Sequence, residues 1–134
     1  LFELPLNVKE IGAKEVVYRL IENDYIPIIA HPERYSYVQQ DINYIEELTQ
    51  MGALLQANYG SIIGMYGSKA EKTVKKLLKN NSIQFLGSDV HRPGQVYEKM
   101  PKIIKKLKKI IPEDKLEELT TLNPQKVLNN EDII

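Results

Sequence analysis

Five polar side chains with metal-binding or substrate-binding chemistry each lie in or directly after a short apolar segment of the sequence. They are Glu3, His31, Asn58, Asp89 and His91, and the two histidines are the only ones in the chain. Imidazole and carboxylate ligands without sulfur suit Mn²⁺, Fe or Zn²⁺ and disfavour Ca²⁺, which prefers oxygen ligands alone. Residues two apart in an extended chain point to the same side, so Asp89 and His91 can converge on one ion. The pattern predicts a metal site formed by Glu3, His31, Asp89 and His91.

Two arginines lie close to these ligands in the sequence, Arg34 in the segment after His31 and Arg92 directly after His91. A guanidinium group binds phosphate in bidentate fashion and stabilises negative charge that develops in a transition state. Arginines beside a metal site therefore indicate a phosphorylated substrate. For Glu33 and Arg34, a surface ion pair that caps the following helix is an equally open interpretation.

Composition excludes several other classes of protein. The 134 residues carry 18 basic and 18 acidic side chains, 43% hydrophobic residues and no cysteine, which fits one globular cytoplasmic domain without disulfides or thiolate metal sites. No apolar stretch approaches the roughly 18 residues of a membrane span. The lysine clusters at 75–79 and 102–109 have no stacking aromatic pattern beside them, so we expect solvated helix faces and no nucleic-acid binding.

Strand and helix patterns alternate along the chain. The apolar and capping patterns predict strands at 1–4, 27–30, 53–58 and from 83 to the Asp89 turn, an irregular loop with a turn of helix at 59–67, and helices at about 7–23, 41–51, 68–79, 96–111, 112–121 and 124–130. The helix after Asn7 is predicted to bury Val8, Ile11, Val16, Val17, Leu20 and Ile21, and the helix after Ser68 to bury Ala70, Val74, Leu77 and Leu78.

The spacing of the polar strand ends favours an α/β fold with four parallel strands. Intervals of about 28, 27 and 31 residues separate Glu3, His31, Asn58 and Asp89, one strand-plus-helix unit each. Four strands are too few to close a barrel. We therefore expect part of a (β/α) barrel whose first strands are missing, a view that the non-methionine residue Leu1 supports. The exposed sheet edge would favour either pairing with a second copy, as in a homo-oligomer, or aggregation.

The segments Ala30-His31-Pro32-Glu33-Arg34-Tyr35 and Ser88-Asp89-Val90-His91 resemble the PHP (polymerase and histidinol phosphatase) superfamily. The likeness is narrower to the bacterial capsule-regulating tyrosine phosphatases of the CpsB/YwqE type, and Asn123-Pro124 fits these proteins as well. The resemblance implies that residues 1–134 are the C-terminal part of a distorted (β/α)₇ PHP domain, a TIM-like barrel, and that 94–134 form its C-terminal helical part.

The same resemblance implies a function for each site residue. Glu3, His31, Asp89 and His91 match metal-ligand positions in a cluster of up to three ions, commonly Mn²⁺. Arg34 matches an arginine that binds the phosphate, and Asn58 a position lining the site. The implied reaction is metal-assisted hydrolysis of phosphotyrosine on the tyrosine-rich tail of a membrane-associated bacterial tyrosine kinase that controls capsule or exopolysaccharide synthesis. Arg34 and His91 would be catalytic, and Arg34, Arg92 and Asn58 would contact substrate.

This sequence also departs from the family pattern. The opening His-x-His strand and an early acidic ligand are absent, and Arg92 lies closer to the Asp-x-His pair than the family's second loop arginine. Two alternatives therefore stay open. One is a PHP phosphatase acting on a small ester such as histidinol phosphate. The other is a module that binds a phosphopeptide without cleaving it.

Overall fold

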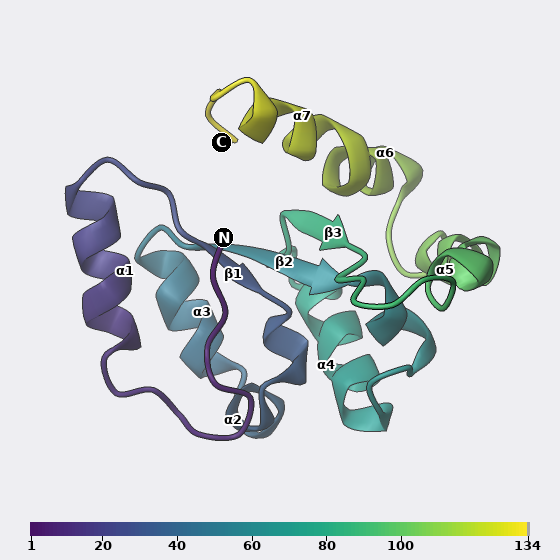
Figure 1. Ribbon diagram of the computed structural model, residues 1–134, viewed down its shortest axis with the longest axis horizontal. Coiled ribbons are helices and arrows are strands. Elements are labelled where there is room, and N and C mark those ends of the chain that lie inside the picture. The colour runs from purple at the N-terminus through teal and green to yellow at the C-terminus, as the bar shows by residue number, and fades with distance from the viewer. Residues whose placement is uncertain (134) are drawn as a thin grey trace.

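A small parallel sheet lies at the centre of the computed structural model, which describes residues 1–133 (Figure 1). Its strands are β1 (Ile28–Ala30), β2 (Leu54–Asn58) and β3 (Phe85–Gly87), in the order β1-β2-β3. Ile29 pairs with Leu55, and Ala57 pairs with Leu86. Because all strands are parallel, their carboxyl ends lie at one edge, where α/β folds place their sites.

The predicted fourth strand is not a strand in the described part of the chain. Phe2 alone pairs with Ile29, in an isolated parallel bridge, through the contacts Phe2 N to Ile28 O and Ala30 N to Phe2 O, both 2.9 Å. Pro5 follows within three residues and cannot donate to a ladder, so the pairing cannot extend in that direction. The α/β architecture with parallel strands is confirmed, and the sheet of the described residues has three strands.

Helical segments connect and cover the strands. Figure 1 shows α1 to α4 on one side of the strands and α6 and α7 beyond β3 on the other. The α-helices are α1 (Ala13–Glu22), α2 (Ser36–Gln40), α3 (Asn43–Gln50), α4 (Ser68–Lys79), α5 (Met100–Leu107), α6 (Glu113–Glu117) and α7 (Asn123–Leu128). The 3₁₀ segments are η1 (Pro32–Arg34), η2 (Tyr59–Ile63) and η3 (Tyr97–Lys99), and a π-helical turn, η4 (Glu118–Leu122), joins α6 to α7.

The core forms between the sheet and the inward helix faces. In α4 the four predicted residues are all buried, as the 3.6-residue period requires. In α1 the prediction is wrong for most of the face: Val17 is buried, but Val8, Ile11, Val16 and Ile21 are exposed. This helix begins at Ala13, six residues after Asn7, so Val8 and Ile11 precede it, whereas Val16 and Ile21 lie within it on an exposed side.

The helices differ from the prediction in two further places. Helix α2 was not predicted, and the segments predicted at 112–121 and 124–130 form one helical run through α6, η4 and α7. Pro124 cannot donate to the helix ladder and its ring crowds the carbonyl four residues earlier. The wider π-helical turn before it accommodates the ring without breaking the run.

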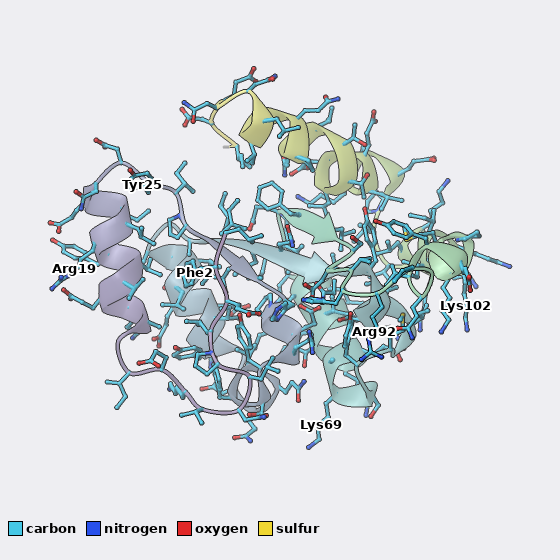
Figure 2. The ribbon with its side chains drawn as sticks, viewed as in Figure 1. Phe2, Arg19, Tyr25, Lys69, Arg92 and Lys102 are labelled. Atoms are coloured by element: carbon cyan, nitrogen blue, oxygen red, sulfur yellow. The ribbon has the colours of Figure 1, made fainter. Side chains whose placement is uncertain are left out.

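Most lysines of α4 and α5 are exposed, whereas Lys75 and Lys106 are half-buried and bond Glu71 between the two helices. Lys69 and Lys102 project away from the body of the molecule (Figure 2), and both are exposed. No helix among residues 1–133 has the length and apolar character that crossing a membrane requires.

Candidate active site

One pocket of about 570 Å³ lies at the carboxyl ends of the strands. All four predicted metal ligands and both arginines line it, and its lining residues are Glu3, His31, Arg34, Met65, Tyr66, Asp89, Val90, His91, Arg92, Gln95 and Val96. The sequence therefore located the side chains that share this pocket, although they come from three separate segments of the chain.

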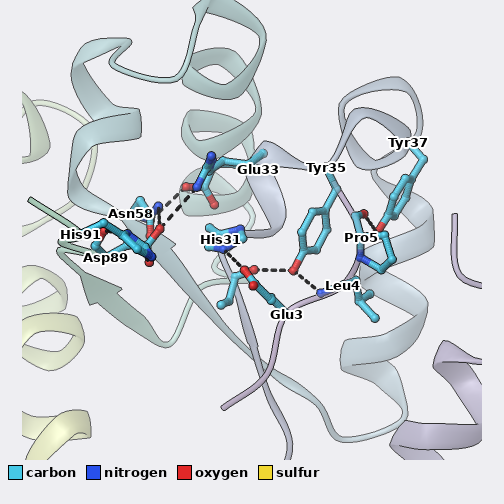
Figure 3. Close-up of polar contacts among 12 residues, drawn as sticks. Glu3, Leu4, Pro5, His31, Glu33, Tyr35, Tyr37, Asn58, Asp89 and His91 are labelled. Atoms are coloured by element: carbon cyan, nitrogen blue, oxygen red, sulfur yellow. Dashed lines mark hydrogen bonds and ion pairs between the residues drawn. The ribbon is translucent and has the colours of Figure 1, made fainter. Parts of the chain in front are cut away.

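Glu3 and His31 form the first pair in the pocket. The Glu3 carboxylate meets the His31 ring (Figure 3), with Glu3 Oε2 2.8 Å from His31 Nε2. The His31 side chain is 4% exposed, whereas that of Glu3 is 70% exposed. Tyr35 fixes the segment that carries Glu3: its hydroxyl donates to Ala30 O at 2.6 Å and accepts from Leu4 N at 2.9 Å. One buried hydroxyl thus holds residues 1–4 against the end of β1.

Asp89 and His91 form the second pair, beyond β3. Asp89 Oδ2 accepts a hydrogen bond from Asn58 Nδ2 at 3.0 Å and lies 3.4 Å from Arg34 Nη1. His91 Nδ1 lies 2.8 Å from the Asp89 backbone oxygen, and the His91 side chain is 80% exposed. Asn58 itself is buried and is not among the residues that line the pocket. Its amide orients Asp89 from behind.

Two of the predicted ligands have a strained backbone. His31 has φ 36° and Asp89 has φ 49°, in the left-handed region that L-residues with a Cβ rarely adopt. Such conformations cost about 1–3 kcal/mol each and cluster at functional sites. His31 directly follows β1 and Asp89 lies two residues beyond β3, so each left-handed turn directs the chain away from the sheet at the pocket.

Glu33 is the site residue whose surroundings the sequence did not indicate. The open alternative of a surface ion pair is wrong for this residue: Glu33 is fully buried, and its Oε1 accepts from Ser61 Oγ at 2.6 Å and from Asn58 N at 2.9 Å. Burial raises the pKa of the Glu33 carboxyl above its ordinary value, and the bonds from Ser61 and Asn58 oppose that rise. Glu33 thereby connects η1 to the end of β2.

Tyr66 was also missed. Its ring lies against the Arg34 guanidinium, whose carbon is 4.2 Å from the ring centroid. Tyr66 lies in the segment predicted as an irregular loop with a turn of helix at 59–67, which contains Gly60, Gly64 and Gly67. The glycines were the available signal of a tightly folded loop.

The donor chemistry of the pocket fits a transition-metal ion. Two imidazoles and two carboxylates line it, and His31 Nδ1 is buried without a hydrogen-bond partner among residues 1–133. Their arrangement is two separate pairs: within residues 1–133, no three histidine, aspartate or glutamate side chains lie close enough to hold a metal ion. Joint ligation by Glu3, His31, Asp89 and His91 stays a prediction.

Comparison with known proteins identifies relatives. The sequence is 36% identical over 91 residues to CapC of Staphylococcus aureus, provisionally named a tyrosine-protein phosphatase, and 33% identical over 91 residues to the tyrosine-protein phosphatase YwqE of Bacillus subtilis. Each alignment covers 68% of this chain and 36% of the relative.

A solved structure agrees with these relatives. The fold matches a chain from the crystal structures of YwqE from Bacillus subtilis and CpsB from Streptococcus pneumoniae, described as unique metal-dependent tyrosine phosphatases. The TM-score is 0.87 at 28% identity, over 98% of this chain and 53% of that one. This chain therefore spans between about a third and a half of the length of the proteins it matches.

A family model covers nearly the whole sequence. The model for capsular polysaccharide synthesis proteins of the CpsB/CapC type matches residues 2–129. This match extends from the Glu3 segment, through both strand-end pairs, to the end of α7. The chain belongs to the CpsB/CapC family of capsular polysaccharide synthesis proteins.

Proposed function

We propose that this chain carries part of the active site of a metal-dependent protein-tyrosine phosphatase. The observation that supports the proposal best is the shared pocket: Glu3, His31, Asp89 and His91 line it together with Arg34 and Arg92. Metal-assisted hydrolysis of a phosphate ester uses both kinds of group, ligands for a cation and donors for the phosphoryl oxygens. The tyrosine phosphatases among the relatives point to a phosphotyrosyl ester as the substrate.

In this proposal the metal ligands are Glu3, His31, Asp89 and His91, and the ion is Mn²⁺, with Fe or Zn²⁺ as other candidates. A bound divalent ion would supply a hydroxide nucleophile at neutral pH and a Lewis acid for the phosphoryl oxygens. Asn58 keeps Asp89 oriented through its 3.0 Å bond, and Glu33 fixes the backbone of Asn58 in turn.

The arginines and histidines have the remaining roles. Arg34 and Arg92 bind the phosphoryl oxygens and stabilise the charge that develops on them in the transition state. A histidine that is not fully committed to the ion protonates the leaving phenolate oxygen. His91 is the candidate for this step where it does not bind the ion, because its contact with the Asp89 carbonyl uses Nδ1 and leaves Nε2 for either metal binding or proton donation, not for both at once.

The wider context follows from the family. We propose that residues 1–134 are part of a PHP domain, a distorted (β/α)₇ barrel whose C-terminal helical part is 94–134, and that the whole protein acts in the cytoplasm. The proposed substrate is the phosphorylated tyrosine-rich tail of a bacterial tyrosine kinase in capsule synthesis. The family's part in capsular polysaccharide synthesis supports this choice.

Metal content tests the proposed ligands. The chain would be loaded with Mn²⁺, desalted and analysed by plasma mass spectrometry, alone and as the variants His31→Ala, Asp89→Asn and, as an exposed control, Asp114→Asn. We expect bound metal in the unmodified chain and in the control, and at least a tenfold loss in the two site variants. Equal metal content in all four proteins would contradict the ligand assignment.

The substrate needs a separate measurement on the same proteins. Release of phosphate from a phosphotyrosine peptide is compared with release from histidinol phosphate, at equal metal loading. Preference for the peptide supports the proposal, and preference for histidinol phosphate would replace the substrate. Binding of the peptide without release of phosphate would indicate a binding module.

A further inference from the structure

Arg34, a proposed phosphate-binding residue, lies between an aromatic ring and a carboxylate. Its guanidinium carbon is 4.2 Å from the centroid of the Tyr66 ring, and its Nη1 is 3.4 Å from Asp89 Oδ2. The contact to Asp89 is long for a charge-assisted hydrogen bond, which is typically about 2.7–2.9 Å. Asp89 alone therefore fixes the guanidinium loosely, and the Tyr66 ring is its second support.

The loop from Tyr59 to Gly67 is folded so that Tyr66 reaches this position. A Cβ added at Gly60 would lie 3.0 Å from Met65 Sδ and 3.0 Å from Tyr66 Cε2, so the absence of a side chain there lets both residues pack closely. Gly64 and Gly67 have φ values of 77° and 94°, which favour glycine. Three glycines thus set the path that carries Met65 and Tyr66 to the wall of the pocket.

We propose that Tyr66 is a positioning residue for Arg34. A cation over the face of an aromatic ring is attracted to it, and a planar guanidinium that stacks there loses freedom before it binds a ligand. A phosphate ion must compete with Asp89 for the guanidinium. The ring holds Arg34 at the pocket wall while its free N–H groups bind the phosphoryl oxygens. This inference rests on the proposed phosphate-binding role of Arg34.

The arginine content of the chain makes a direct observation practical. There are three arginines, Arg19, Arg34 and Arg92, so the Nε–H region of a ¹⁵N NMR spectrum contains three side-chain signals. Arg19 is paired with Glu15 on the exposed surface of α1 and serves as an internal reference. A guanidinium over an aromatic ring has its signal displaced by the ring current. Tyr66→Phe keeps the ring, Tyr66→Leu removes it, and Tyr25→Leu changes an exposed tyrosine before β1 as a matched control.

The spectra test the geometry first. We expect the displaced Arg34 signal in the unmodified chain, in Tyr66→Phe and in Tyr25→Leu, and a shift toward the Arg19 position in Tyr66→Leu. An Arg34 signal that is the same in Tyr66→Leu and in the unmodified chain would overturn the inference, because the ring would then not lie over the guanidinium.

Titration with inorganic phosphate tests the consequence. We expect Tyr66→Leu to bind phosphate about 2- to 30-fold more weakly than the unmodified chain, because it lacks the cation–π contact. The shift of the Arg34 signal during the titration measures this affinity. We expect Tyr66→Phe and the control to stay within about twofold of the unmodified chain. Recovery by phenylalanine separates positioning by the ring from a role of the hydroxyl.

The remaining outcomes distinguish this inference from the proposed function. Phosphate affinity that is unchanged in Tyr66→Leu would overturn the positioning role and leave phosphate binding by Arg34 intact. Loss of phosphotyrosine affinity with unchanged phosphate affinity would assign the ring to the aryl group of the substrate instead. Absence of any phosphate response at Arg34 in the unmodified chain would overturn both the inference and the proposed role of Arg34.

Discussion

At the scale of single residues, the site depends on a carboxyl group that does not face the pocket. Glu33 lies fully buried behind Asn58, and Asn58 in turn donates to Asp89. The backbone N–H of Asn58 and the hydroxyl of Ser61 have the Glu33 Oε1 as their acceptor. Leaving a buried donor without an acceptor lowers the free energy of unfolding by about 1–3 kcal/mol. This carboxyl therefore stabilises both the fold and the position of Asp89.

Replacing Glu33 tests this dependence. Glu33→Ala should lower the free energy of unfolding by about 3 kcal/mol, because two buried donors lose their acceptor and a cavity remains. Glu33→Gln keeps an acceptor oxygen and should cost about 1 kcal/mol. Urea denaturation measures both, with exposed Glu98→Ala as the control, expected within about 0.5 kcal/mol of the unmodified chain. An equally small effect in Glu33→Ala would show that the carboxyl does not hold these donors.

The sequence predicted ligands and arginines that line one pocket, but not how their surroundings are built. His31, Asp89 and His91 were identified because each lies at or just beyond the end of an apolar segment, and parallel strands end at one edge. The burial of Glu33 and the contact between Tyr66 and Arg34 depend on tertiary packing of segments 25 or more residues apart. No local pattern of residue types encodes such a contact.

At the scale of secondary structure, prediction succeeded where a buried face is continuous. Helix α4 shows this, with its four predicted apolar residues all buried. It failed where a boundary depends on the neighbours, as at α1, whose expected N-cap Asn7 precedes the helix by six residues. Proline signals also misled: η4 widens before Pro124, so the helical run continues through it.

An ion network joins two of these helices and should give the protein a measurable pH dependence. Glu71 of α4 receives bonds from Lys106 of α5 at 2.6 Å and from Lys75 at 2.7 Å. These bonds lower the pKa of Glu71 from 4.5 to about 2. Because the native pKa lies below that of the unfolded chain, the stabilisation is complete above about pH 4.5 and is lost as the pH falls toward 2.

The variant Glu71→Gln should therefore be less stable than the unmodified chain by about 1 kcal/mol at pH 7, as expected for a partly exposed network. The difference should shrink toward zero between pH 4.5 and 2, because protonation removes the same charge from the unmodified chain. Denaturation at a series of pH values measures it. Glu113→Gln, which breaks the more exposed pair with Lys108, is the matched control and should show a smaller effect. A difference that stays constant with pH would contradict the role of the charge.

At the scale of the whole molecule, the proposed metal ligands connect distant parts of the chain. Glu3 lies in the segment that pairs with β1, His31 follows β1, and Asp89 and His91 follow β3. The sequence predicted the parallel strands that bring these segments together. Whether further strands complete a barrel depends on strand pairing beyond the three strands of this sheet. An ion bound by all these segments would favour only the folded chain, in which they lie together.

Metal should therefore stabilise the entire fold and not only its pocket. Mn²⁺ at about 100 times its dissociation constant should raise the free energy of unfolding by about 2.7 kcal/mol, because the unfolded chain does not bring the ligands together. His31→Ala should abolish the increase, and Asp114→Asn should keep it. Urea denaturation with and without Mn²⁺ measures the effect and requires no enzymatic activity. An equal increase in His31→Ala would place the binding ion elsewhere. No increase in any of the proteins would mean that the two pairs, Glu3–His31 and Asp89–His91, do not bind one ion in this chain.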